Sequence, residues 1–221
     1  MTGSMSRADL VADLRAALHD VRTVFEGEDG EEEATYGRLL DLAAGDFARH
    51  RPRVMTGSLQ LKHGNGLYAA PMDLYRFYRT VWGDSTMLQP WEPGYGLYRK
   101  PRVDVVESNG DDGTPVRSLQ LSPAPSIDQI VHLGAHFRYL YYANHVIAER
   151  ATGTTIRPDD RDLLLLRAKA EAMREVATRD SFKPVQLRDG LNSGPRNRQP
   201  AALLQVYMAE FEARITQRIV A

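Results

Sequence analysis

Residues 126–150 read SIDQIVHLGAHFRYLYYANHVIAER, and this stretch decides the expected fold class because it shows the longest helical pattern. Ser126 and Gln129 have the spacing of a capping box, in which two side chains satisfy free backbone amides at a helix start. Apolar and aromatic residues then recur at intervals of three and four, namely Ile130, Leu133, Phe137, Leu140, Tyr141, Val146 and Ile147. This spacing predicts one helix over about residues 126–150 with a buried face.

Two more helical patterns follow it. Residues 160–179 carry an apolar side around Leu163–Leu166, and the face expected to be exposed alternates Arg167, Lys169, Glu171, Arg174 and Glu175. Residues 200–219 carry a stripe of Leu203, Leu204, Tyr207, Phe211 and Ile215. Three successive helices in the second half of the chain favour a mainly α fold, a helical bundle.

The first half adds helices and short strands to this bundle. Ser6 and Asp9 resemble a capping box before a helix over about 7–25, and a second helix is expected over about 35–50. Between them lies GEDGEEE (27–33), which indicates an acidic linker. Strand pairs are expected at about 58–70 and 102–121, with a short helix at about 71–82 between them.

The predicted organisation is therefore an N-terminal helix and acidic linker over residues 1–34, followed by a helical domain over 35–221. Small β-hairpins are inserted in this domain at about 58–70 and 102–121, and it ends in a docking loop and helix.

Composition excludes several classes of protein. The chain has 221 residues, a formal net charge of -1 and no cysteine, so disulfides, thiol nucleophiles and cysteine-bound metals are absent. No apolar run approaches the roughly 20 residues of a membrane span, and the N-terminus lacks the apolar core of a secretory signal. We expect no membrane partner and synthesis in a cytoplasm.

No catalytic motif stands out. His132 and His136 are four residues apart on the predicted helix and suggest zinc, but no third ligand or following glutamate completes the pattern. No G-x-S-x-G serine motif is present. We therefore expect no catalytic, metal or cofactor residues and a protein that is not an enzyme. A metal-dependent hydrolase using the two histidines remains a weak alternative.

Basic residues gather near the C-terminus. From Ser181 to Ala221 there are six basic and three acidic residues, a local charge of about +3. Lys183, Arg188, Arg196 and Arg198 lie in a Gly- and Pro-rich stretch, where they are candidates for contact with DNA phosphates or an acidic partner.

Two longer stretches carry a family resemblance. The first runs from DFARHRPR (46–53) through GSLQL (57–61) and LYAAPMDL (67–74) to Trp82-Gly83. The second runs from LQLSPAPS (119–126) through 139–146 to DRDLLLLRAKAEAM (160–173). Their order resembles head-to-tail adaptor proteins (connector or head-completion proteins) of tailed bacteriophages and gene transfer agents, over roughly residues 35–215.

The resemblance implies a structural protein of the virion neck, between head and tail. Members of that family form rings, commonly of twelve copies, that bind the portal protein and the next neck or tail-completion protein. Double-stranded DNA passes through the ring.

Ring assembly requires apolar surface beyond the monomer core. The last helix, with Leu203, Leu204, Tyr207, Phe211 and Ile215, and the loop residues Trp91 and Tyr95 are the candidates for this interface. The alternative for the helix is that it closes its own bundle. The alternative for the whole protein is a DNA-binding or DNA-packaging accessory protein.

Overall fold

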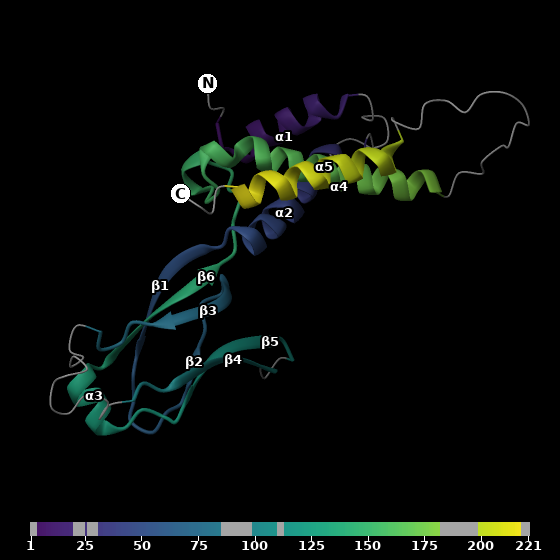
Figure 1. The fold of residues 1–221 in the computed structure, drawn as a ribbon. Coiled ribbons are helices and arrows are strands. Elements are labelled where there is room, and N and C mark those ends of the chain that lie inside the picture. The colour runs from purple at the N-terminus through teal and green to yellow at the C-terminus, as the bar shows by residue number, and fades with distance from the viewer. Residues whose placement is uncertain are drawn as a thin grey trace, which may run out of the picture. The chain divides into compact units, whose positions relative to one another are not determined.

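The chain forms two compact units in a computed structural model that describes residues 4–19, 25, 31–84, 99–109, 113–181 and 199–217 (Figure 1). The helical unit comprises residues 1–51 and 145–221, and the β unit comprises residues 52–144. The β unit is thus an insertion between the two halves of the helical unit. The boundary predicted between residues 34 and 35 falls inside a helix of the first unit.

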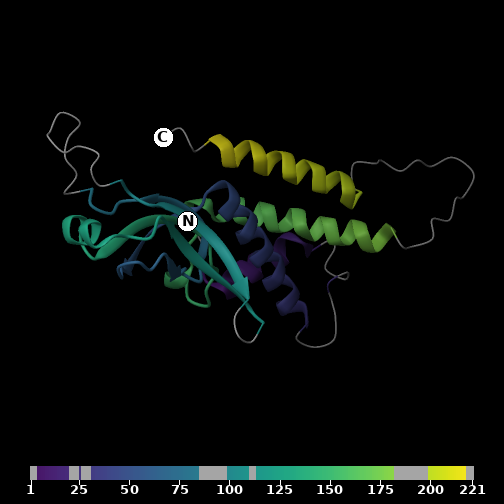
Figure 2. The same cartoon turned by 90° about the horizontal axis from the view of Figure 1, so that it is seen from below.

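Four helices build the helical unit. They are α1 (Arg7–Ala17), α2 (Glu31–His50), α4 (Arg161–Ser181) and α5 (Pro200–Gln217), with short 3-10 turns at Ala151–Gly153 and Pro158–Asp160. Helix α4 contacts the other three helices and lies side by side with α5 in Figures 1 and 2. Among the described residues, α4 supplies seven side chains to the buried core of this unit, more than any other helix.

The ends of the first two helices show how local chemistry sets them. Ser6 caps α1, and its hydroxyl accepts a hydrogen bond from the Asp9 amide at 3.2 Å, as the sequence predicts. The helix ends at Ala17, well before the expected residue 25. Helix α2 begins at Glu31, inside the predicted acidic linker, because negative side chains stabilise the N-terminal end of a helix dipole.

The β unit consists of two three-stranded antiparallel sheets. One sheet has the order β1-β6-β3 and the other has the order β2-β5-β4. The strands are β1 (Arg53–Gln60), β2 (Leu67–Ala69), β3 (Leu74–Thr80), β4 (Arg102–Asn109), β5 (Pro115–Ser122) and β6 (His136–Ala143), and a short helix, α3 (Ile127–Leu133), precedes β6.

The predicted mainly α helical bundle is therefore wrong, and the fold is mixed α/β. The helix expected over 126–150 starts at its capping box but ends at Gly134, whose φ of 94° cannot continue a helix. The following strand β6 alternates exposed and buried positions, which is a period of two. The helix expected over 71–82 is likewise strand β3.

Strand pairing also differs from the simple hairpins expected. Strands β4 and β5 do form a hairpin, with Arg102 opposite Ser122 and Asn109 opposite Pro115. The two strands of the expected 58–70 pair, however, belong to different sheets, because β1 pairs with β6 and β2 pairs with β5. The region therefore links the two sheets and does not stand apart from them.

An aromatic cluster fills the core of the β unit. Phe137, Tyr139 and Tyr141 of β6 point to the same side, where they meet Leu119 and Leu121 of β5. The Tyr139 ring lies against β1 at Gly57, where an added Cβ would stand 2.2 Å from the ring carbon that bears the hydroxyl. Only glycine leaves room for this ring.

A buried arginine, Arg167, is the centre of a cluster of ion pairs in the helical unit. Arg167 is 6% exposed, and its Nε lies 2.7 Å from Asp46 of α2 while its Nη2 contacts Glu171, which is 4% exposed. Arg49 lies 2.8 Å from Asp46 and Arg174 lies 2.6 Å from Glu171, so cations and carboxylates alternate. The prediction that Arg167 and Glu171 lie on an exposed face of their helix is wrong, because α2 and α5 cover that side of α4.

Removing the central cation should destabilise the helical unit. We expect Arg167→Ala to lower the free energy of unfolding by about 3–5 kcal/mol, because it leaves two carboxylates without their buried partner. Loss of the helical circular-dichroism signal in urea measures this. Arg38→Ala, which breaks a more exposed pair with Glu175, should cost below about 1 kcal/mol. An equal loss of unfolding free energy in the two variants would contradict the central role of Arg167 in the helical unit.

A methyl group at Gly57 should destabilise the β unit. We expect Gly57→Ala to cost about 1–3 kcal/mol, because the buried Tyr139 ring has no space into which to move. The near-ultraviolet circular dichroism of the aromatic cluster, followed during unfolding, reports the change. Gly45→Ala in α2 is the matched control: nothing lies within 4 Å of the added Cβ, so we expect no loss of stability.

Candidate functional site

The largest exposed apolar side chains gather in the β unit. Nine of the twelve among the described residues lie there, namely Val54, Leu67, Met72, Tyr75, Tyr78, Val105, Val116, Ile127 and Val131. The helical unit contributes Leu42, Val146 and Val206. Single exposed apolar residues are ordinary, but such a concentration in the smaller unit indicates surfaces that contact other molecules.

Helix α3 presents one such surface. Ile130 and Leu133 pack against the β core, while Ile127 and Val131 are 58% and 72% exposed on the helix. Residues four apart lie on the same side of a helix, so these two side chains form a short apolar stripe. Both side chains stay largely exposed, and neither belongs to the apolar core that the described residues form.

A second apolar surface lies on the sheet β2-β5-β4. Leu67 pairs with Gln120 and Val116 lies four residues before Gln120 on β5, so both side chains project from the same face. They are 51% and 41% exposed. Strand β2 pairs with residues 118–120 of β5, and the Ala70 amide donates to the Arg117 carbonyl at 3.1 Å, so within the described residues β5 has an open edge at Pro115 and Val116.

The sheet β1-β6-β3 has a polar outer face. We define this outer face by Val54, Thr56 and Ser58 of β1, Arg138, Leu140 and Tyr142 of β6, and Arg76, Tyr78 and Arg79 of β3. Arg76 lies opposite Tyr142 and Arg79 lies opposite Leu140. The Arg76 guanidinium is 4.9 Å from the centre of the Tyr142 ring. The centres of the Tyr78 and Tyr142 rings are also 4.9 Å apart.

The inner tyrosines of the same sheet have altered acidity. Burial, and then the neighbouring Tyr141 and Asp73, raise the pKa of Tyr139 to about 12. Burial also raises the pKa of Tyr141, with a further contribution from the hydrogen bond that its hydroxyl donates to Asp73 at 3.0 Å. Both hydroxyls therefore stay protonated over the physiological range. This fits side chains of the core.

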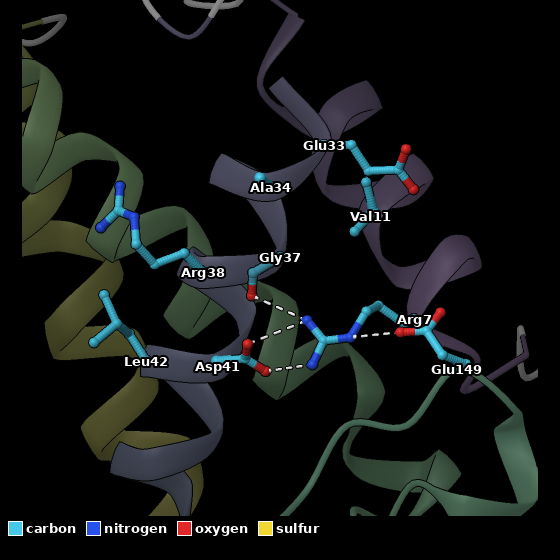
Figure 3. A pocket seen from close by; sticks show the side chains of 9 residues that line it. All are labelled: Arg7, Val11, Glu33, Ala34, Gly37, Arg38, Asp41, Leu42 and Glu149. Carbon is cyan, nitrogen blue, oxygen red and sulfur yellow. Dashed lines mark hydrogen bonds and ion pairs between the residues drawn. The ribbon is translucent and has the colours of Figure 1, made fainter. Parts of the chain in front are cut away.

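A hollow of about 530 Å³ lies in the helical unit beside α1 and α2. Figure 3 shows Arg7 within it, bonded to Asp41 at 2.7 Å and to Glu149 at 3.3 Å. The hydrogen bond to Asp41 is the main reason that the pKa of Arg7 is raised. Arg7 also donates to the carbonyl of Ile147 at 3.0 Å, so the charged groups here tie α1 to two other segments.

The predicted interface residues of α5 face the core of their own unit. Phe211 and Ile215 are buried, and Leu203, Leu204 and Tyr207 are partly buried against the same core. This corresponds to the alternative in which the last helix closes its own bundle. The other candidates lie outside the described residues, namely Trp91, Tyr95, Lys183, Arg188, Arg196 and Arg198.

The histidines are dispersed. His132 lies in α3 and His136 opens β6, so the two do not share a helical face. His145 lies in the helical unit, where both ring nitrogens form hydrogen bonds. Nε2 is 2.8 Å from the Arg51 carbonyl and Nδ1 is 3.1 Å from the Thr155 hydroxyl. Within the described ranges, no group of three His, Asp or Glu side chains is placed to hold a metal ion.

Sequence reasoning missed the outer face and the α3 stripe. The outer face was missed because the strand at 136–143 was expected to be helical, and the stripe was missed because Ile127 and Val131 were not among the apolar positions selected for that helix. A signal for the face was present, since β1, β3 and β6 contain arginines and tyrosines but no Asp or Glu.

Comparisons with known proteins give no further assignment. The sequence matches no model of a known protein family and none of the curated proteins. Among the helices that the structure describes, none is both long enough and apolar enough to cross a membrane.

The raised pKa of Tyr139 predicts a loss of stability in alkali. The protonated hydroxyl is favoured in the fold, so this contribution is complete below the ordinary tyrosine pKa of 10.0 and is lost as the pH rises toward about 12. We expect the free energy of unfolding to fall across this window, and less steeply in Tyr139→Phe. An identical pH dependence in both proteins would contradict the assignment.

Proposed function

We propose that the chain is a structural adaptor of the virion neck, which assembles as a ring between the portal of the capsid and the tail and lets DNA pass. The order of segments over roughly residues 35–215 resembles head-to-tail adaptor proteins. The observation that carries the proposal in the structure is the concentration of exposed apolar side chains in the inserted β unit.

The two units differ in how much apolar surface they expose, and this difference supports the role. The helical unit buries its apolar residues, including those of α5, and holds them with the Arg167 cluster. The β unit exposes the α3 stripe, the Leu67–Val116 face and an open strand edge. A protein that joins two others needs a rigid body and protruding contact surfaces, and apolar side chains at the centre of such contacts supply most of the binding energy.

A docking role fits these features better than catalysis does. In the described part of the chain, the hollow beside α1 and α2 contains Arg7, which bonds the lining carboxylates Asp41 and Glu149 and so joins three segments. The buried charges around Arg167 are likewise paired within the helical unit. These groups are used to hold segments together.

Binding to the portal protein tests the proposal. The purified full chain, mixed with the portal protein of the same virus, should elute in a large complex in size-exclusion chromatography. We expect Ile127→Ser with Val131→Ser to weaken this binding at least tenfold, because truncating an apolar centre of an interface costs more than about 1.4 kcal/mol.

The matched control changes exposed apolar residues of the helical unit. Val146→Ser with Val206→Ser removes the same side-chain type at comparable exposure and should bind the portal as the unchanged protein does. Absence of any complex would count against the neck role. Equal weakening by both double variants would contradict the assignment of docking to the β unit.

A further inference from the structure

The outer face of the sheet β1-β6-β3 has a charge pattern that the adaptor role leaves unexplained. Arg76, Arg79 and Arg138 are exposed, and none of them forms an ion pair with a residue that the structure describes. No carboxylate occurs in the three strands. All the charged side chains of this face are thus basic.

The second sheet of the same unit shows the contrast. There Arg102 lies 3.0 Å from Asp104, and Arg117 lies 2.7 Å from Glu107. The exposed strand arginines of the second sheet are therefore paired with acids. Three arginines without acids on the outer face indicate a negatively charged ligand.

Strand geometry brings these charges close together. Arg76 and Arg79 oppose Tyr142 and Leu140, which are two residues apart on β6, so their backbones are separated by about 7 Å. Arg138 lies two residues beyond Leu140 on the same face of β6. Like charges within the Debye length of about 8–10 Å at ordinary salt reinforce one another's potential. The arrangement suits a row of phosphates.

Aromatic rings lie between the arginines. Tyr78 is 48% exposed and its ring meets that of Tyr142, while Arg76 covers the Tyr142 ring. The aliphatic side chains of Val54 and Leu140 flank the rings on the same face. Exposed rings beside guanidinium groups are the arrangement on which nucleobases stack while phosphates are neutralised.

We propose that this outer face binds single-stranded nucleic acid. The arginines contact the phosphodiester backbone and Tyr78 stacks on an unpaired base. A duplex hides the faces of its bases and offers nothing to Tyr78. An acidic peptide satisfies the arginines but stacks on the ring only where it carries an aromatic residue, whereas every nucleotide of a single strand carries a base. The proposal does not rest on the neck role, and it differs from the contact with DNA phosphates or an acidic partner predicted for Lys183, Arg188, Arg196 and Arg198.

Fluorescence anisotropy with the full chain and a labelled oligothymidylate tests it, using a strand longer than the roughly 4–16 nucleotides that such sites cover. We expect Arg76→Gln, Arg79→Gln and Arg138→Gln together to weaken binding at least tenfold. The slope of log affinity against log salt should fall by about 2, at about 0.7 for each lost phosphate contact.

Tyr78 separates stacking from charge. Tyr78→Ala should weaken binding about tenfold without changing the salt slope, and Tyr78→Phe should bind as the unchanged protein does, because the ring is kept. Arg102→Gln on the other sheet is the control for losing one exposed arginine and should change affinity less than about twofold, because that arginine is paired with Asp104.

Several outcomes would overturn the proposal. One is that the oligonucleotide shows no binding to the folded chain at low salt. Another is that the triple arginine variant binds as tightly as the unchanged protein, which places any site elsewhere. A third is that a duplex binds as tightly as the single strand and Tyr78→Ala has no effect. Portal binding is measured separately, so a failure here leaves the neck proposal standing, and the reverse also holds.

Discussion

The alternation of side chains along β6 (His136–Ala143) constrains the β unit more than any other feature, because this strand is paired on both edges. Its neighbours β1 and β3 leave no freedom to shift register without turning every side chain to the opposite face. Phe137, Tyr139 and Tyr141 therefore have to enter the core. Arg138, Leu140 and Tyr142 have to leave it, and one strand thus builds both the stability of the unit and the face proposed to bind nucleic acid.

The helical unit is organised around a different constraint, a charge that cannot reach water. Arg167 is held by Asp46 from α2 and by Glu171 from its own helix, and the Phe211 ring of α5 lies 5.9 Å from its guanidinium. Three helices are fixed relative to one another by this one side chain. With α5 fixed in this way, its apolar stripe serves its own core, and the proposed contacts with other proteins are therefore assigned to the β unit.

Much of the helical unit could be predicted from the sequence. The capping residue Ser6 gives the start of α1, although not its end, and the apolar positions of α4 and α5 place these two helices within a few residues. The burial of Arg167 and Glu171 could not be read in the same way. Their spacing resembles an exposed ion pair, and only the packing of α2 and α5 over α4 places them inside.

The β unit was harder to predict from the sequence, for a physical reason. Around β6 the apolar residues fit both periods, because Phe137, Leu140 and Tyr141 have helical spacing while Phe137, Tyr139 and Tyr141 alternate. What decides between them is the turn at Gly134 and the pairing with β1 and β3, which are far away in the sequence. Since the outer face exists only once β6 is a strand, the side chains that share it could not be grouped beforehand.

Hydrogen exchange of the full chain, alone and mixed with the portal protein, tests most directly the claim that the β unit makes the contacts. The account predicts slower exchange on binding in α3 and along β5, with little change in α4 and α5. Protection that appeared only in α4 and α5, or none anywhere in the chain, would contradict it.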